Sequence, residues 1–276
     1  MTVLLGVAHG SKDDRSQQVV RELLSAASTL RPGLRAEGAY VDNASPSIRS
    51  MIATLADEGV DDIVVLPLLL TPASHSKTDV AASVQAARLE HPGVRFRYGR
   101  PLGPHPVLVE VLATRLAEAG VREGDAVVLV AGGSLDPDAN AQIAATARLL
   151  WEGRGYASVD IAFASTTGPT VPEALERLQR LGTRRVAVAQ YFLGPGRLPD
   201  AVSRSAAVDG VEVVVTEPLG AHPLIAALVL ERYDEALGAD IRMNCDACLY
   251  RIPFPGREAK VGALQVPHIH PDDAAS

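Results

Sequence analysis

Apolar positions change their spacing in a regular order along the chain. Short runs of branched and leucine side chains, such as 3–8 and 62–70, are typical of buried strands, whereas 16–30 has apolar residues at helical spacing. In the first half this pattern predicts strands at 3–8, 34–41, 62–70 and 94–98, and helices at 16–30, 46–59, 79–90 and 106–119. In the second half it predicts strands at 126–131, 158–164, 185–193 and 211–216, and helices at 140–153, 170–181 and 223–237. Alternating strands and helices favour parallel βαβ units.

The second half repeats the first. The segment "AHGS" at 8–11 matches "AGGS" at 131–134, and Pro46 matches Pro169, both at a separation of 123 positions. The segment "RPLGPHPVL" at 100–108 matches "EPLGAHPLI" at 217–225 at a separation of 117. We therefore predict an α/β protein with two similar domains, 1–120 and 121–240, each a mainly parallel four-stranded sheet flanked by helices. A tail at 241–276 matches neither half.

Composition narrows the class of protein. Of the 276 residues, 47% are hydrophobic, which is enough for the cores of two domains. The net charge of −7 does not favour nucleic acid or an anionic membrane as a partner. No apolar run approaches the roughly 20 residues that span a bilayer, and the first residues lack the basic region of a signal peptide. We expect a cytoplasmic protein.

Three titratable residues follow the first three predicted strands. His9 comes directly after the first strand, Asp42 after the second, and His75 a few residues after the third. In an open parallel sheet, ligands bind at the carboxyl ends of the strands. Two neutral imidazoles suit a divalent transition metal, and a nearby carboxylate can serve as a third ligand or accept a proton. The sequence thus predicts a metal site formed by these three residues.

A histidine after a strand is often only a hydrogen-bonded polar group, and the second half helps to decide. It keeps a glycine and a serine at 133–134, but it has Gly132 in place of His9 and no histidine in "GPGRLPDA". If the two imidazoles only supported the fold, the second copy should need them as well. By the same reasoning His105 and His222, which occur in both copies of "PLG-x-HP", are predicted to organise a loop that enters a helix.

These motifs together resemble the sirohydrochlorin chelatase family, the small class II chelatases that insert cobalt or iron. The resemblance rests on "AHGS", "AYVDNASPSI", "LPLLLTPASHSKTDV" and "PLGPHP", and it covers essentially the whole chain because long members contain two such halves. It implies that His9 and His75 bind the incoming metal, either Fe²⁺ or Co²⁺. The family often has glutamate where this chain has Asp42.

The implied reaction needs a metal holder, a proton acceptor and a cleft for a flat, polycarboxylated ring, because a divalent metal replaces two pyrrole protons. It needs no nucleotide, and the phosphate-loop motif G-x-x-x-x-G-K-[ST] is absent. We expect His9 and His75 to hold the metal, and one of them or Asp42 to accept protons. Side chains beside the histidines are candidates to bind the substrate's carboxylates, with a solvated surface as the alternative: Ser11, Lys12, Ser74, Ser76 and Lys77.

The tail contains a C-x-x-C pair, Cys245 and Cys248, in "MNCDACLYR". This segment resembles the M-x-C-x-x-C segment of long family members that carry an iron–sulfur cluster. A four-iron cluster usually needs four ligands. The missing ligands would come from a second subunit or from His268 and His270, unless the cluster is smaller. A zinc site that uses the same two histidines and a plain dithiol are the alternatives.

The expected function is a sirohydrochlorin chelatase that inserts Fe²⁺ to give sirohaem. A cobaltochelatase of cobalamin biosynthesis and a non-catalytic carrier of metal or tetrapyrrole are the alternatives. The expected partners are sirohydrochlorin and a divalent metal ion. The internal duplication also makes a monomer plausible, because one chain supplies both halves.

Overall fold

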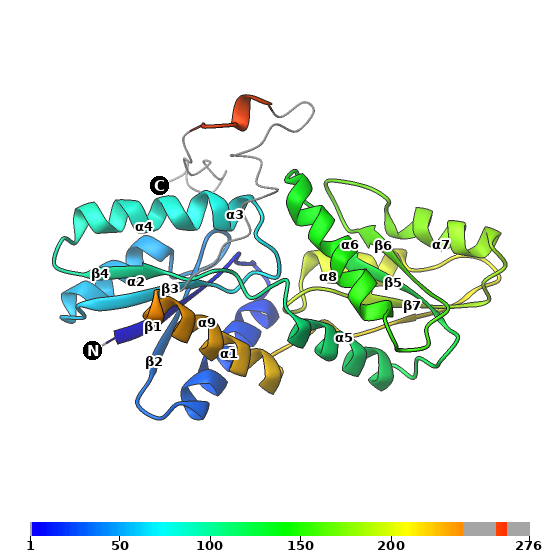
Figure 1. Ribbon diagram of the computed structural model, residues 1–276, viewed down its shortest axis with the longest axis horizontal. Coiled ribbons are helices and arrows are strands. Elements are labelled where there is room, and N and C mark those ends of the chain that lie inside the picture. Colours follow the sequence, from blue (N-terminus) through cyan, green and yellow to red (C-terminus); the bar gives the residue numbers. More distant parts are fainter. Residues whose placement is uncertain (1, 240–257, 264–276) are drawn as a thin grey trace. The chain divides into compact units, whose positions relative to one another are not determined.

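Two parallel four-stranded sheets form the protein, which is seen as a computed structural model in Figure 1. The structure describes residues 2–239 and 258–263, with the backbone alone for Ser74 and His75. The first sheet has the order β2-β1-β3-β4, from β1 (Thr2–Ala8), β2 (Arg35–Tyr40), β3 (Asp62–Pro67) and β4 (Arg95–Tyr98). The second has the order β6-β5-β7-β8, from β5 (Ala126–Ala131), β6 (Ser158–Phe163), β7 (Arg185–Gln190) and β8 (Glu212–Val215). The predicted fold class is confirmed.

Helices cover both sheets (Figure 1). The helices are α1 (Asp14–Leu30), α2 (Ile48–Asp57), α3 (Ser74–Lys77), α4 (Asp79–Glu90), α5 (Pro106–Glu118), α6 (Pro137–Trp151), α7 (Val171–Arg180), α8 (Arg197–Ser205) and α9 (Pro223–Gly238), with a 3₁₀ turn η1 (Glu258–Lys260). Sequence periodicity missed two of them, α3 and α8. Both follow the third strand of a sheet, in the proline-containing segments "TPASHSK" at 71–77 and "GPGRLPD" at 194–200, which are too short to show a long apolar period.

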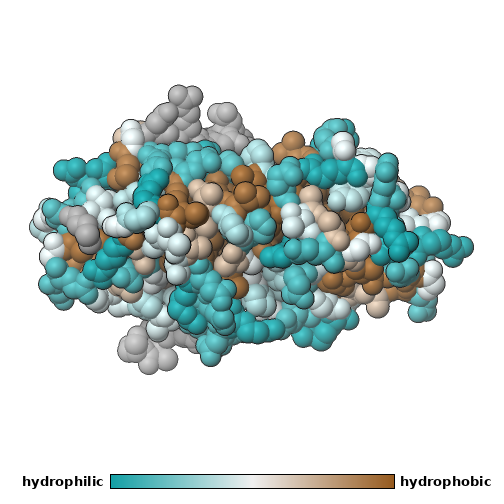
Figure 2. Space-filling view, turned by 90° about the horizontal axis from the view of Figure 1, so that it is seen from below, coloured by the Kyte–Doolittle hydropathy of each residue, from teal (hydrophilic) through white to brown (hydrophobic). Residues whose placement is uncertain are grey.

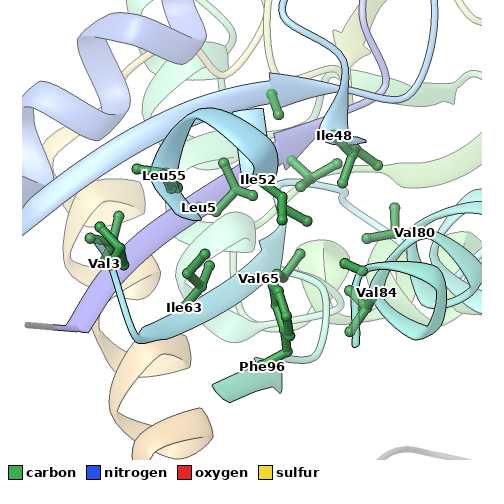
Figure 3. Packing of buried hydrophobic residues seen from close by; sticks show 14 residues of the cluster. Val3, Leu5, Ile48, Ile52, Leu55, Ile63, Val65, Val80, Val84 and Phe96 are labelled. Carbon is green, nitrogen blue, oxygen red and sulfur yellow. The ribbon is translucent and has the colours of Figure 1, made fainter. Parts of the chain in front are cut away.

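The core of the first sheet is built on alternation along its strands. Leu5, Ile63 and Val65 point to one face and pack against α2 and α4, as Figure 3 shows. The opposite face packs against α1, where the Leu24 side chain lies over Gly6. A strand covered on both faces is apolar without interruption, which is why β1 and β3 read as continuous hydrophobic runs.

The chain divides into two compact units that exchange one helix each. The first unit comprises residues Met1–Gly103 with Ile225–Ser276, and the second comprises Pro104–Leu224. Helix α5 follows β4 in sequence yet belongs to the second unit, and α9 follows β8 yet belongs to the first. The predicted domains 1–120 and 121–240 follow the sequence repeat, whereas the compact units swap the last helix of each repeat.

A pair of equivalent arginines fastens the exchanged helices. Arg232 of α9 is buried and donates from Nε to the Pro101 carbonyl (3.2 Å) and from Nη2 to the Leu102 carbonyl (3.2 Å). Arg115 of α5 donates in the same way to the carbonyls of residues 218 (3.1 Å) and 219 (2.7 Å). The arginine and both acceptor residues of one unit are separated from their counterparts in the other by the 117 positions of the "PLG-x-HP" repeat. Each exchanged helix is thus held within its unit by the same contact.

Two histidines start the exchanged helices. His105 Nδ1 accepts a hydrogen bond from the Val107 backbone N–H (3.2 Å), and His222 Nδ1 accepts one from the Leu224 N–H (3.2 Å). This confirms the predicted role at a loop that enters a helix. Burial, and then the nearby Arg115 guanidinium, lower the pKa of His222. Because the folded state prefers the neutral ring, this contribution to stability is present above about pH 6.5 and is lost as the pH falls through the lowered folded pKa.

We expect His105→Ala and His222→Ala each to lower the free energy of unfolding by about 1 kcal/mol, because each leaves a helix N-terminus without its cap. Urea denaturation at pH 7 measures this. The matched controls are His105→Asn and His222→Asn, since asparagine is a strong N-cap and should retain most of the stability. An asparagine variant as unstable as the alanine variant would contradict the capping role.

None of the described helices is long and apolar enough to cross a bilayer. On the face drawn in Figure 2, hydrophilic residues predominate and hydrophobic residues are interspersed among them.

Candidate functional site

His9 and Asp42 lie next to each other at the carboxyl ends of β1 and β2. The last paired residues of the two strands are Ala8 and Tyr40. Parallel pairing continues beyond the strands, because the Val41 N–H donates to the Ala8 carbonyl (3.0 Å) and the Asp42 N–H donates to the His9 carbonyl (2.9 Å). His9 is exposed and Asp42 is half-buried. The structure therefore brings these two predicted site residues together through their backbones.

Gly10 makes this close approach feasible. Its φ of +100° lies in the left-handed region, and a Cβ atom built on it would be 1.6 Å from the Asp42 carbonyl oxygen. No side chain fits there, so glycine alone allows β1 to end against the loop that carries Asp42.

The Asp42 carboxylate is held by the next residue. The Asn43 backbone N–H donates to Asp42 Oδ1 (2.7 Å), and Asn43 Nδ2 donates to Asp42 Oδ2 (2.5 Å). These two hydrogen bonds therefore fix the orientation of the Asp42 carboxylate after the end of β2.

His75 is carried by the short helix α3, beyond the end of β3. The strand end is fixed by a hydrogen bond from the Leu68 N–H to the Val7 carbonyl (2.7 Å). Helix α3 is tied to β4, because the Tyr98 hydroxyl donates to the Ser76 carbonyl (2.5 Å). Burial raises the pKa of Tyr98, so this hydroxyl stays protonated and remains a donor at neutral pH. The side chains of Ser74 and His75 lie outside the described part of the chain, and their roles stay predictions.

The other predicted substrate-binding residues differ in exposure. Lys12 is exposed and Ser11 is half-buried. Ser11 Oγ accepts a hydrogen bond from the Asp13 N–H (3.1 Å), and the equivalent Ser134 accepts one from the Asp136 N–H (3.0 Å), so this serine shapes the turn in both units. Ser76 and Lys77 are only 1% and 9% exposed. The roles of all four residues in substrate binding stay predictions, and the burial of Ser76 and Lys77 within α3 weighs against those two.

Helix α1 begins beside this site with a charged cap. Asp13 accepts a hydrogen bond from the Arg15 N–H (3.0 Å) and forms an ion pair with the Arg15 guanidinium (2.6 Å). These contacts lower the pKa of the Asp13 carboxyl. The cap satisfies a backbone donor that would otherwise be open at the helix N-terminus.

The second unit has the same turn without the side chains that are predicted to form the metal site. The Ser165 N–H donates to the Gly132 carbonyl (3.1 Å), which repeats the contact between Asp42 and His9. Gly133 has a φ of +85°, and a Cβ on it would be 2.1 Å from the Ser165 carbonyl oxygen. Serine thus stands where the first unit has Asp42. Sequence reasoning missed this loss, although the 123-residue separation that revealed Gly132 also relates residue 42 to residue 165.

Apolar side chains occupy the neighbourhood of Gly132. Leu198 lies 123 positions after His75, and its Cδ1 is 3.8 Å from where a Cβ of Gly132 would be; Phe192 Cε1 is 3.9 Å from the same point. All three predicted metal-site positions have therefore changed in the second unit. The backbone frame is retained, whereas the three residues predicted to form the metal site occur only in the first unit.

Within the side chains that the structure describes, no three His, Cys, Asp or Glu residues gather closely enough to hold a metal ion. The predicted site includes His75, which is not in that set. Cys245 and Cys248, with His268 and His270, also lie outside the described residues. The iron–sulfur and zinc hypotheses for the tail therefore have no support from the structure.

Comparisons with known proteins agree with the duplicated architecture. A family model described as CbiX matches residues 3–119 and again residues 126–236. The chain is 34% identical to "Sirohydrochlorin cobaltochelatase" of Priestia megaterium over 91% of this chain and 85% of that one. It is 27% identical to "Sirohydrochlorin ferrochelatase" of Bacillus subtilis (strain 168) over 84% of this chain and 90% of that one. The solved structure "SirB from Bacillus subtilis with Fe3+" superposes with a TM-score of 0.74 at 26% identity, covering 87% of this chain and 97% of that one.

Proposed function

This chain belongs to the CbiX family, and on that premise we propose that it is a sirohydrochlorin chelatase, a lyase that inserts a divalent metal into sirohydrochlorin without nucleotide hydrolysis. One structural observation supports the proposal most strongly. His9 and Asp42, which carry an imidazole and a carboxylate, are joined by a backbone hydrogen bond at the ends of β1 and β2, on a turn whose copy in the second unit has neither side chain.

The metal is a substrate of this reaction. Two pyrrole N–H protons leave the ring as one divalent ion enters, so the ring gains no net charge. His9 and His75 supply neutral imidazole nitrogens, which suit Fe²⁺ and Co²⁺ alike. Asp42 follows the neighbouring strand and bonds through its backbone to His9, and in this mechanism its carboxylate accepts a pyrrole proton. The roles of these three residues are part of the proposal.

The substrate carries carboxylates, and the exposed edge of the site offers complementary groups. Lys12 is an exposed cation next to the turn at Gly10, and Ser11 lies between them. We assign the rim to Ser11, Lys12 and Ser74. Ser76 and Lys77 fit that role less well because the structure buries them.

Two lines of reasoning favour different metals as the substrate. The sequence motifs lead us to expect Fe²⁺, and two relatives bear the name ferrochelatase at 27% and 28% identity. A relative at 34% identity bears the name cobaltochelatase, which favours Co²⁺. Since the imidazole ligands accept both ions, we propose that both enter the ring and that their relative rates define the physiological class. We also propose that the protein is cytoplasmic and monomeric. The presence of both units in one chain supports the monomer.

We expect purified protein to accelerate insertion of Fe²⁺ and Co²⁺ into sirohydrochlorin under anaerobic conditions, because a held metal and a nearby base lower the barrier to proton loss. Absorbance spectra follow the reaction, with Ni²⁺ as a third ion. A protein-free reaction at the same metal concentration is the control. A non-catalytic carrier would bind the ring without raising the rate, so a rate equal to the control would contradict the enzyme.

A further inference from the structure

Asn43 has a backbone conformation that most residues avoid. Its φ is +55°, in the left-handed region, at the point where the loop after β2 leaves Asp42. Asparagine tolerates this region better than most residues other than glycine. One explanation for the asparagine at this position is therefore that the turn requires a residue that tolerates a left-handed φ.

The second unit shows that the turn does not require asparagine. Thr166 lies 123 positions after Asn43 and has a φ of +69°, although a branched side chain is poorly suited to that conformation. The flanking backbone contacts are also repeated, from the Asp42 N–H to the His9 carbonyl and from the Ser165 N–H to the Gly132 carbonyl. The fold therefore accepts another residue at this position, and the asparagine side chain needs a further reason.

The hydrogen bonds from Asn43 to the Asp42 carboxylate supply that reason. Asn43 Nδ2 donates to Asp42 Oδ2 at 2.5 Å, while the Asn43 backbone N–H donates to Oδ1 at 2.7 Å. With both oxygens engaged, the carboxylate plane cannot rotate freely about its terminal torsion. In the second unit Ser165 has no carboxylate to orient; its Oγ donates to the Gly132 carbonyl (2.8 Å) and lies 3.2 Å from Thr166 Oγ1. The amide is present in the unit that has the carboxylate and absent from the unit that lacks it.

We propose that Asn43 is a positioning residue for metal insertion: its side-chain amide fixes the orientation of the Asp42 carboxylate beside His9. This inference rests on the proposed function, in which Asp42 accepts a pyrrole proton. A carboxylate held in one orientation presents its oxygens in a fixed direction. The entropic cost of orienting the proton acceptor is then lower at each turnover. Asn43 itself does not contact the reacting atoms in this proposal.

Asn43→Gly separates the two explanations, because glycine keeps the left-handed backbone and the backbone N–H donor but removes the amide. We expect its melting temperature to stay within about 3 °C of the wild type. Its kcat for Co²⁺ insertion should fall about 10-fold, the usual range for losing a group that orients a functional side chain. Its KM for sirohydrochlorin should stay within about 2-fold, because the amide acts only through Asp42. A wild-type kcat in this variant would overturn the proposal.

Asn43→Asp is the second variant, since it is nearly isosteric and also tolerates the left-handed region. It cannot donate from an ionised side chain, and it places a second negative charge beside Asp42. We expect it to be slower than Asn43→Gly. Full activity of Asn43→Asp would overturn the proposal as well.

A measurement without turnover distinguishes this inference from the proposed function. In protein labelled with ¹⁵N-asparagine, the side-chain amide signal of Asn43 should shift when Asp42 is replaced by alanine, because the hydrogen bond to Oδ2 is lost. An unmoved signal would refute the positioning contact even if the wild type is active. If the wild type inserts no metal while the signal shifts, the contact is real and the proposed function is the part that fails.

Discussion

His9→Ala is expected to reduce metal insertion more than about 100-fold while changing the free energy of unfolding by less than about 0.5 kcal/mol. His9 is exposed and lies after the last paired residues of β1, so its side chain contributes little to the core. Its loss removes one of the two imidazoles that bind the metal in the proposed mechanism. Initial rates of insertion and urea denaturation measure the two quantities.

Gly132→Ala is the matched control for this variant. Gly132 is the equivalent position in the second unit, and a Cβ there would meet only ordinary contacts, with Leu198 Cδ1 at 3.8 Å. We expect this variant to keep the wild-type insertion rate. His75→Ala should lose activity as His9→Ala does. A large loss of stability in either histidine variant would instead indicate a structural role.

Gly10→Ala is expected to lower the free energy of unfolding by at least about 2 kcal/mol and to abolish insertion even in the molecules that remain folded. The left-handed φ of +100° disfavours alanine, and the new Cβ would overlap the Asp42 carbonyl oxygen at 1.6 Å. The loop must move to relieve this clash, which displaces Asp42 from His9. Single-turnover insertion, corrected for the folded fraction, measures the second effect.

Gly133→Ala provides the comparison for Gly10→Ala. Its Cβ would lie 2.1 Å from the Ser165 carbonyl oxygen at a φ of +85°, so we expect a similar loss of stability. The displaced residue there is a serine with no proposed part in the reaction. The folded fraction of Gly133→Ala should therefore keep its insertion rate, and equal losses of activity in both glycine variants would contradict the assignment of the chemistry to the first unit.

Much of the fold could be predicted from local patterns. The ranges of α4 and β5 agree with the periodicity, and the repeat in the sequence correctly indicated two similar sheets. The exchange of α5 and α9 could not be predicted, because an amphipathic pattern shows that a helix has an apolar face but not which sheet it covers. The arginines that fasten these helices bind backbone carbonyls, and such contacts leave no motif in the sequence.

The site was predictable to the extent that it depends on strand ends. His9 and Asp42 were expected to lie close together because parallel strands end at one edge, and the backbone contact between them agrees with that expectation. The burial of Ser76 and Lys77 was not foreseen, because α3 is too short to show a helical period. The contact of Asn43 with Asp42 was missed for another reason: it depends on a left-handed φ, which adjacent letters do not reveal.

The central claim is that metal insertion depends on the imidazole at the end of β1, which the copied turn in the second unit lacks. The most direct test is the initial rate of Co²⁺ insertion into sirohydrochlorin by His9→Gly, which gives the first unit the residue that the second unit has at this position. We predict a rate indistinguishable from the protein-free reaction. A folded His9→Gly protein that inserts the metal at the wild-type rate would contradict the claim.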